Sequence, residues 1–158
     1  MIQHFHDLSI DTVGFSMHSI TSDVEDFVEG SGLCNGLCQL SVLHTSASLL
    51  IQENASVDVQ RDIVRFLDTI APMDSDRYEH DLEGPDDMPA HLKTTLTQTH
   101  LTLSIRESKL VLGTWQGIFL VEHRVKGSER RVQIHLVCLL YTSPSPRDTE
   151  RSRMPSSA

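Results

Sequence analysis

Apolar and polar positions alternate with two different periods along this chain, and the change of period separates predicted helices from predicted strands. The clearest helix is expected from about Ser56 to Ile70, where apolar residues recur every three or four positions on one face and Asn54 is placed to cap the start. A capping-box pattern beginning at Ser22 predicts an earlier helix, which two nearby glycines would end. A short third helix is expected from Pro89, because proline is favoured in a first helical turn.

The other apolar segments have the two-residue period of strands. Residues 4–16 predict one or two strands, and residues 36–52 predict two strands or one strand kinked at the polar triplet that begins with His44. From Thr99 onward the alternation predicts a β-meander in which residues 126–129 form a hairpin turn. This order of elements predicts the α+β class, with a single compact domain whose β-sheets, arranged as a sandwich or barrel-like, are flanked by about three helices.

The composition changes near the end of the chain and divides it into a domain over residues 1–137 and a tail over residues 138–158. Residues 142–158 contain three prolines, five serines and three arginines, and Met154 is their only large apolar side chain. Such a composition buries too little apolar surface to order a chain, so the tail is predicted to be disordered. Its sequence also resembles an out-of-frame translation, which favours a tail that is not native to the protein.

Length and charge narrow the class of protein further. A chain of 158 residues fits one domain, and a net charge of −9 repels phosphate backbones, so nucleic acid is not an expected partner. No apolar run reaches the length of a membrane span, and the N-terminus lacks the charged and apolar regions of a signal peptide. Three cysteines are too few for a disulfide framework and fit a reducing compartment, so we expect a cytoplasmic protein that does not contact membranes.

Three of the nine histidines stand in polar surroundings beside breaks in the predicted elements. His44 follows an apolar stretch, His80 lies in an acidic loop, and His91 lies in the first turn of the short helix. The partial positive charge at a helix start favours the neutral ring of His91, which is the form that binds metals. A shared metal site is therefore one interpretation. Because the spacing matches no compact metal motif, ordinary surface or loop positions are the other.

Acidic and basic residues near these histidines suit catalysis or substrate binding, and each has a plainer interpretation. Glu53 can supply a carboxylate to a site or simply end a strand, and Asp87 can bind Mg²⁺ or stabilise the start of a helix. Arg124, Arg130 and Arg131 can hold a phosphate through charge-assisted hydrogen bonds or form a solvated strand edge. The sequence contains no P-loop and no recognised nucleophile motif.

Three segments, in this order, resemble one family over about residues 3–137, nearly the whole predicted domain. They are Leu43–Leu49 with Glu53–Ala55, Tyr78–Asp81 with Glu83–His91, and Leu112–Ile118 with Glu122–Arg124. The family is that of the YjbQ-like proteins, which are also described as secondary thiamine-phosphate synthases.

The resemblance implies an α+β fold, a homotrimer and polar residues gathered near the subunit contacts. It favours a divalent metal site made of His44, His80 and His91, since all three motif histidines are present. Imidazole ligands favour Zn²⁺, while nearby carboxylates would admit Mg²⁺ or Mn²⁺. The resemblance also implies a weak thiamine-phosphate synthase activity, which can be a side reaction. In that reaction a pyrimidine pyrophosphate joins a thiazole phosphate and pyrophosphate leaves.

Two functions from different classes follow from these observations. The first is a metal-assisted enzyme that acts on a small phosphorylated molecule, in which Glu53 or Asp87 serves as a base or orients a ligand and Arg124 contacts the anionic substrate. The second is a non-catalytic trimeric module that binds a metal or a small anion, which agrees with the lack of a nucleophile or cofactor motif.

Overall fold

The computed structural model describes residues 1–138. Residues 139–158 lie outside the described residues, and with them nearly all of the predicted tail. Cys138 is the last residue of the last strand, so it belongs to the folded domain. The elements in chain order are β1 (Ile2–Asp11), β2 (Ser16–Ser19), α1 (Thr21–Gly30), β3 (Asn35–Val42), β4 (Ala47–Glu53), α2 (Val57–Ile70), the 3-10 helix η1 (Ser75–Arg77), α3 (Asp87–Leu96), β5 (His100–Arg106), β6 (Lys109–Leu110), β7 (Gln116–Glu122) and β8 (Glu129–Cys138).

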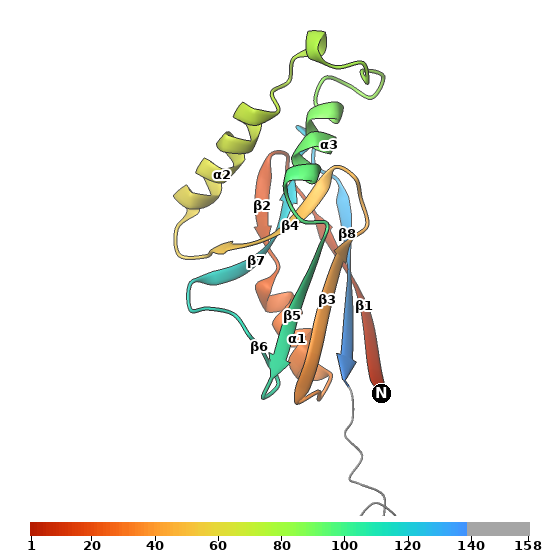
Figure 1. The fold of residues 1–158 in the computed structure, drawn as a ribbon, viewed down its shortest axis with the longest axis vertical. Helices are drawn as coiled ribbons and strands as arrows, with labels where there is room; N and C mark the ends of the chain where they lie inside the picture. Colours follow the sequence, from red (N-terminus) through yellow and green to blue (C-terminus); the bar gives the residue numbers. More distant parts are fainter. Residues whose placement is uncertain (139–158) are drawn as a thin grey trace, which may run out of the picture.

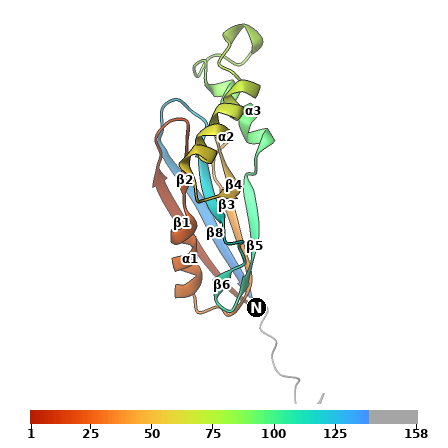
Figure 2. The ribbon, with the colours of Figure 1, turned by 90° about the vertical axis from the view of Figure 1, so that its left-hand side faces the viewer.

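Two antiparallel sheets build the body of the molecule. One has five strands in the order β1-β8-β3-β5-β6, and the other has three strands in the order β2-β7-β4. The sheets curl into a half-barrel, with α1 at one end and α3 at the other (Figures 1 and 2). The predicted α+β class and the predicted number of helices are therefore confirmed.

Alternate side chains of the strands point inward and form the hydrophobic core. The inward residues of β3 and β8 are buried, namely Cys38, Leu40, Val42, Val132, Ile134 and Leu136. From α1, Val24 and Val28 join the same core. Burial raises the pKa of Cys38 to about 12, so this thiol stays protonated and behaves as a small apolar side chain.

The start of α1 differs from the predicted one. The helix begins at Thr21, and its N-cap residue Ile20 makes no capping hydrogen bond from a side chain, so the predicted capping box at Ser22 is wrong. Ile20 is buried, and its backbone N–H donates to Ile118 O of β7 at 2.9 Å. Packing against the sheet, rather than a polar cap, therefore fixes where this helix begins.

The cap of α2 also differs from the prediction. The side chain of Ser56 accepts a hydrogen bond from Asp58 N at 3.2 Å and caps the helix. Asn54, the predicted cap, instead donates through its amide to Gln116 O at 3.4 Å. The helix itself is where its periodicity predicted it, over Val57–Ile70.

The predicted meander is wrong beyond its first hairpin. β5 and β6 form a hairpin, and Glu107 and Ser108 adopt the left-handed backbone of a tight two-residue turn. β7, however, pairs with β2 and β4, whereas β8 pairs with β1 and β3. Residues 123–128 therefore carry the chain from one sheet to the other, and the hairpin turn predicted at residues 126–129 is absent. The triplet at His44 does the same between β3 and β4, which are two strands in different sheets.

The helices α2 and α3 bury unexpected faces. On α2 only Leu67 is buried, while part of its apolar stripe remains exposed. On α3 the large apolar side chain of Leu96 is exposed, and polar residues are buried instead. Lys93 of α3 is 2% exposed and donates to Asp68 of α2 at 3.0 Å. Within residues 1–138, no helix is both long enough and apolar enough to cross a membrane.

Candidate functional site

Two crossings between the sheets and the start of α3 meet at one end of the molecule. The β3–β4 connection and the β7–β8 connection lie side by side, because His123 N donates to Ser46 O at 3.2 Å. The start of α3 is fixed over them, since Val125 N donates to Asp86 Oδ2 at 2.8 Å. Irregular backbone from three parts of the sequence therefore surrounds one place at the end opposite α1 (Figure 1).

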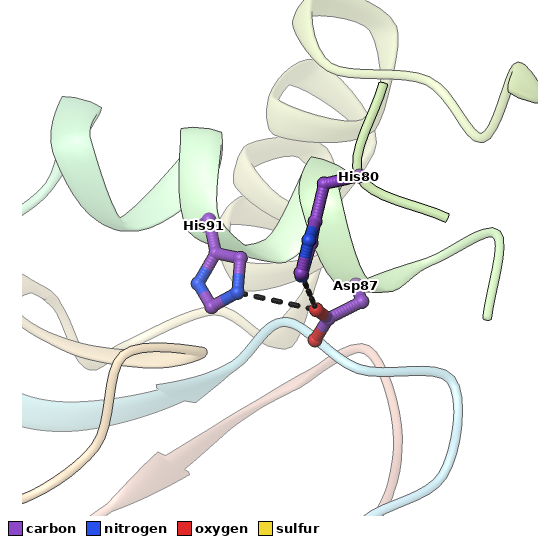
Figure 3. Close-up of side chains that lie close together, drawn as sticks. All are labelled: His80, Asp87 and His91. Atoms are coloured by element: carbon purple, nitrogen blue, oxygen red, sulfur yellow. Dashed lines mark hydrogen bonds and ion pairs between the residues drawn. The ribbon is translucent and has the colours of Figure 1, made fainter. Parts of the chain in front are cut away.

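Two of the predicted histidines lie at this place together with Asp87. Asp87 Oδ2 is 2.8 Å from His80 Nε2 and 3.2 Å from His91 Nε2. One turn of α3 separates Asp87 from His91, and His80 reaches them from the loop before the helix, so both rings point at the same carboxylate (Figure 3). The three potential ligand atoms lie within 4.8 Å of one another.

The hydrogen bonds of His91 fix which of its nitrogens is free. His91 Nδ1 is 3.1 Å from Thr45 O, and a carbonyl oxygen only accepts, so Nδ1 carries a proton. In the neutral ring Nε2 then has a lone pair that faces the carboxylate of Asp87. Two acceptors face each other unless a proton or a cation lies between them. This arrangement resembles the usual one of a metal-binding histidine, whose other ring nitrogen donates to a carbonyl or carboxylate.

The third predicted histidine, His44, lies nearby but outside the cluster. Its Nδ1 accepts a hydrogen bond from Ser46 N at 3.0 Å. In the neutral ring the proton is therefore on Nε2, which makes that atom a donor rather than a metal ligand. Burial, together with the charges of Arg130 and Arg124, lowers the pKa of His44 and favours this neutral form. The role of His44 as a third ligand stays a prediction.

Arg124 connects the site to the start of α3. Its guanidinium donates to Asp86 Oδ2 at 3.0 Å, to Asp87 Oδ1 and to Glu83 O at 2.9 Å. Burial opposes the charge of Arg124, but these acidic partners raise its pKa. Burial likewise opposes ionisation of Asp86, and the hydrogen bonds from Val125 N and Arg124 still lower its pKa. Arg124, the residue predicted to contact the substrate, therefore already uses its charge to hold the carboxylates of Asp86 and Asp87 in place.

A buried ion pair between Arg130 and Glu122 lies beside this site, and the sequence analysis gave Glu122 no role. Arg130 is 4% exposed and donates to both carboxylate oxygens of Glu122, at 2.6 and 2.9 Å. Thr12 Oγ1 donates to the same carboxylate at 2.7 Å. Burial opposes ionisation of Glu122, yet the bonds from Arg130 and Thr12 lower its pKa. Arg130, proposed above as a phosphate contact, therefore has its main partner inside the protein.

His123 is a further buried polar residue that the sequence analysis missed. It is 2% exposed, and its Nε2 lies 2.8 Å from Ser48 Oγ. Burial and the charge of Lys93 lower the pKa of His123 to about 4, so the ring is neutral at physiological pH. Both residues lie within the matched motifs, but nothing in the local sequence indicates that Ser48 of β4 lies next to His123, the residue after β7.

Two pockets adjoin His44 and His91. The first, which we call the charged pocket, has a volume of about 620 Å³, and three acidic and three basic residues line it with His44 and His91: Glu83, Asp86, Asp87, Arg124, Lys126 and Arg130. The second has a volume of about 520 Å³ and shares His44, Thr45 and His91 with the first. Because the charges around the first pocket are balanced in number, an anion gains little net attraction there unless a cation is added.

Glu53, predicted as a catalytic residue, lies in another part of the molecule, away from the histidines. It is the last residue of β4. The seven residues of this strand span roughly 20 Å, and the site is at the other end of the strand. Glu53 lines a different pocket of about 470 Å³ with the exposed Trp115 and Gln116. Within one chain the structure does not bring Glu53 to the histidines, and its catalytic role stays a prediction.

Residues 6–138 match the sequence profile described as UPF0047 protein YjbQ-like. Among curated relatives, the UPF0047 protein sll1880 of Synechocystis is 47% identical over 134 residues, which cover 85% of this chain and 91% of that protein. The UPF0047 protein YjbQ of Escherichia coli O157:H7 is 41% identical over 126 residues, covering 79% of this chain and 89% of that protein.

Solved structures agree with the fold. A YbjQ-like protein of unknown function from Sulfolobus solfataricus superimposes with a TM-score of 0.79 at 32% identity, covering 85% of this chain and 96% of that one. The hypothetical protein APE1520 from Aeropyrum pernix superimposes with a TM-score of 0.78 at 26% identity, covering 86% and 99%. The similarity therefore extends over nearly all of the described domain.

Proposed function

The chain belongs to the UPF0047 family of YjbQ-like proteins, and from this premise we propose that it is a metal-assisted enzyme acting on a small phosphorylated substrate. The observation that carries the proposal is the cluster of His80, Asp87 and His91, whose ligand atoms lie within 4.8 Å of one another. The cluster adjoins a pocket of about 620 Å³. A pocket of this size accommodates a small organic molecule, since such sites typically measure ~300–1,000 Å³.

The donor set fits a divalent metal. In tetrahedral coordination with ligand bonds of ~2.0–2.1 Å, neighbouring ligand atoms are roughly 3.3 Å apart. The two histidine nitrogens lie 2.8 and 3.2 Å from Asp87 Oδ2, close to that spacing. Two imidazoles and one carboxylate favour Zn²⁺ and admit Mn²⁺ or Mg²⁺. We propose His80, Asp87 and His91 as the ligands, with the set that includes His44 as the alternative.

The chain's own groups would then bind and orient the substrate. A divalent cation, when bound, supplies positive charge to phosphate oxygens and lowers the pKa of bound water. Lys126 lines the charged pocket and is the basic residue there that makes no ion pair within residues 1–138. His44 presents its Nε2–H as a neutral donor at the edge of the pocket, while Arg124 holds Asp86 and Asp87 in position.

The specific reaction we propose to assay first is thiamine-phosphate synthesis, in which a phosphorylated thiazole displaces pyrophosphate from a pyrimidine. Protein loaded with Zn²⁺, Mn²⁺ or Mg²⁺ is incubated with both substrates, and in parallel with simple phosphate esters. Turnover should require the metal and should be lost in His91→Ala. The matched control is His135→Ala, because His135 lies on the open face of the five-stranded sheet, stacked on Phe5. Equal turnover by the two variants would contradict the proposal.

A non-catalytic module that binds a metal or an anion is the second candidate. One observation favours it: Ser48 and His123, which are paired as a nucleophile and a base could be, are both at most 2% exposed. A substrate cannot reach this serine. Tight metal binding without turnover of any phosphorylated compound would support the module and reject the enzyme.

We also propose that the protein forms a homotrimer, with α2 in the contact. Val57, Phe66 and Ile70 of this helix are 58%, 63% and 49% exposed, although they are large and apolar. Apolar area of this kind is usually buried against a partner. Sedimentation equilibrium should give three times the chain mass of 17.7 kDa, and Phe66→Glu should lower it. A monomeric wild-type protein would contradict the proposal.

A further inference from the structure

His44 and His91 stand between two pockets rather than at the bottom of one. His44, Thr45 and His91 line the charged pocket on one side and a pocket of about 520 Å³ on the other. We call the latter the threonine pocket. Besides those three residues it is lined by Thr94, Thr95, Thr97, Gln98, Thr99 and His100. A ligand placed across the shared wall would therefore occupy two different chemical environments.

The threonine pocket has no aspartate, glutamate, lysine or arginine among its lining residues in the described chain. The hydroxyls of Thr94, Thr95 and Thr97 are also already used as donors. Thr95 Oγ1 donates to Leu92 O at 2.7 Å, and Thr97 Oγ1 donates to Lys93 O at 2.9 Å. A hydroxyl has one proton, so these groups offer a ligand methyl surface and acceptor oxygens rather than donors.

The part of this surface that Thr95 and Thr97 form is unsuited to an anion. Removing an anion from water is costly unless donors or positive charges replace the water, and the hydroxyls of Thr95 and Thr97 supply neither. An uncharged group with apolar faces and a few N–H or O–H donors fits the methyl groups and acceptor oxygens instead. The volume of about 520 Å³ is sufficient for at least one ring.

We propose that the threonine pocket is the subsite for the uncharged part of the substrate, whose phosphate lies in the charged pocket. The substrate class is therefore a phosphate ester of an uncharged organic group, bound across His44 and His91. His44 is placed to donate at the junction, since its Nδ1 already accepts from Ser46 N. This inference rests on the proposed function, because it takes the charged pocket with its metal as the phosphate site.

The test compares two ligands on the Zn²⁺-loaded full chain by titration calorimetry. Phenyl phosphate carries an uncharged ring that inorganic phosphate lacks, so we expect it to bind about tenfold more tightly, which corresponds to ~1.4 kcal/mol. Thr95→Trp fills the threonine pocket at an exposed helical position, and we expect it to abolish that preference. The affinity for inorganic phosphate and the metal content should stay unchanged.

The matched control is Leu96→Trp. Leu96 is the next residue of α3 and is also exposed, but it does not line the pocket, so this variant should keep the tenfold preference. Gln98→Trp gives a second way to fill the pocket if Thr95→Trp disturbs the helix.

Two outcomes overturn the inference, and they differ from each other. If both filling variants keep the preference for phenyl phosphate, the threonine pocket is not the subsite while the proposed function stands. If the wild-type protein binds neither Zn²⁺ nor phosphate, the proposed function fails and the subsite fails with it.

Discussion

The two ends of the half-barrel bury different kinds of side chain. The end with α1 buries apolar residues, among them Val24, Val28, Leu33, Ile105 and Leu110. The end with α3 buries charged and polar residues, namely Asp86, Asp87, Lys93, Glu122, His123 and Arg130. Apolar burial stabilises the fold directly, whereas buried charge stabilises it only when each charge has a partner in good geometry.

The charged end is organised to meet that condition. Within residues 1–138, every buried side-chain nitrogen and oxygen has a hydrogen-bond partner. Arg130 binds Glu122, Lys93 binds Asp68, and Arg124 binds Asp86. A protein gains little stability from such pairs compared with apolar residues of the same size. In the proposed function this end holds ligand groups in fixed positions, while apolar burial at the α1 end stabilises the fold.

The largest expected effect is at the charged end, where Glu122→Ala would leave Arg130 buried without its partner. Both side chains are almost fully buried, at 0% and 4% exposure. We expect the free energy of unfolding to fall by ~3–5 kcal/mol, as for other broken buried pairs. Urea denaturation measures the change. A loss below ~1 kcal/mol would mean that the pair behaves like a surface pair and that the comparison is wrong.

A substitution that leaves a cavity in the apolar core tests the same comparison between the two ends. Leu40 is fully buried, and Leu40→Ala should lower the free energy of unfolding by ~2–5 kcal/mol. Because Leu40 does not line either pocket at the histidines, metal content measured on the folded variant should match the wild type. If the variant is fully folded and still loses its metal, then packing in the apolar core affects metal binding at the other end.

The pH dependence of stability should come from the charged end. The pKa of His123 is about 4 in the folded protein, below its ordinary value of 6.5. The unfolded chain therefore binds more protons between these values, and stability is lost as pH falls from about 6.5 towards about 4. The expected loss is ~1.4 kcal/mol per pH unit, or roughly 3 kcal/mol in total.

The variant His123→Gln separates this residue from the other titrating groups. Glutamine keeps a hydrogen-bonding nitrogen near Ser48 but does not titrate, so its stability should change less steeply over the same pH range. Urea midpoints at several pH values give both slopes. Parallel slopes for the variant and the wild type would exclude His123 as the source.

The smallest effect is expected at an exposed ion pair. Arg61 and Asp58 of α2 are 3.1 Å apart, with side chains 64% and 82% exposed. Arg61→Ala should change the free energy of unfolding by no more than ~0.5 kcal/mol. The same urea titration measures it, and a change as large as that of Glu122→Ala would remove the distinction between buried and exposed pairs.

Local patterns in the sequence predicted much of the fold. The periodicity of α2 and the alternation along β3, β5 and β8 depend on neighbours within a few positions, and these elements are present as predicted. The sheet to which each strand belongs depends on contacts between distant residues. The apolar and polar pattern of β7 and β8 is compatible with a hairpin, and their pairing with β2, β4, β1 and β3 could not be read from it.

The same difference applies to the candidate site. His91 and Asp87 are one helical turn apart, so their proximity follows from the helix, and the motif indicated His80. The contact between Thr12 and Glu122 joins residues 110 positions apart, and no local signal marks it. Glu53 stands only nine residues after His44, but β4 carries it to the other end of the strand.

The most direct test of the central claim, that His80, Asp87 and His91 bind a divalent metal, is metal content by elemental mass spectrometry on tag-free protein. We expect about one metal per chain in the wild type and in the control His135→Ala, as in other sites with three protein ligands. We expect almost none in His91→Ala and Asp87→Asn. Equal metal content in all four proteins, or its absence from the wild type after incubation with Zn²⁺, would contradict the account.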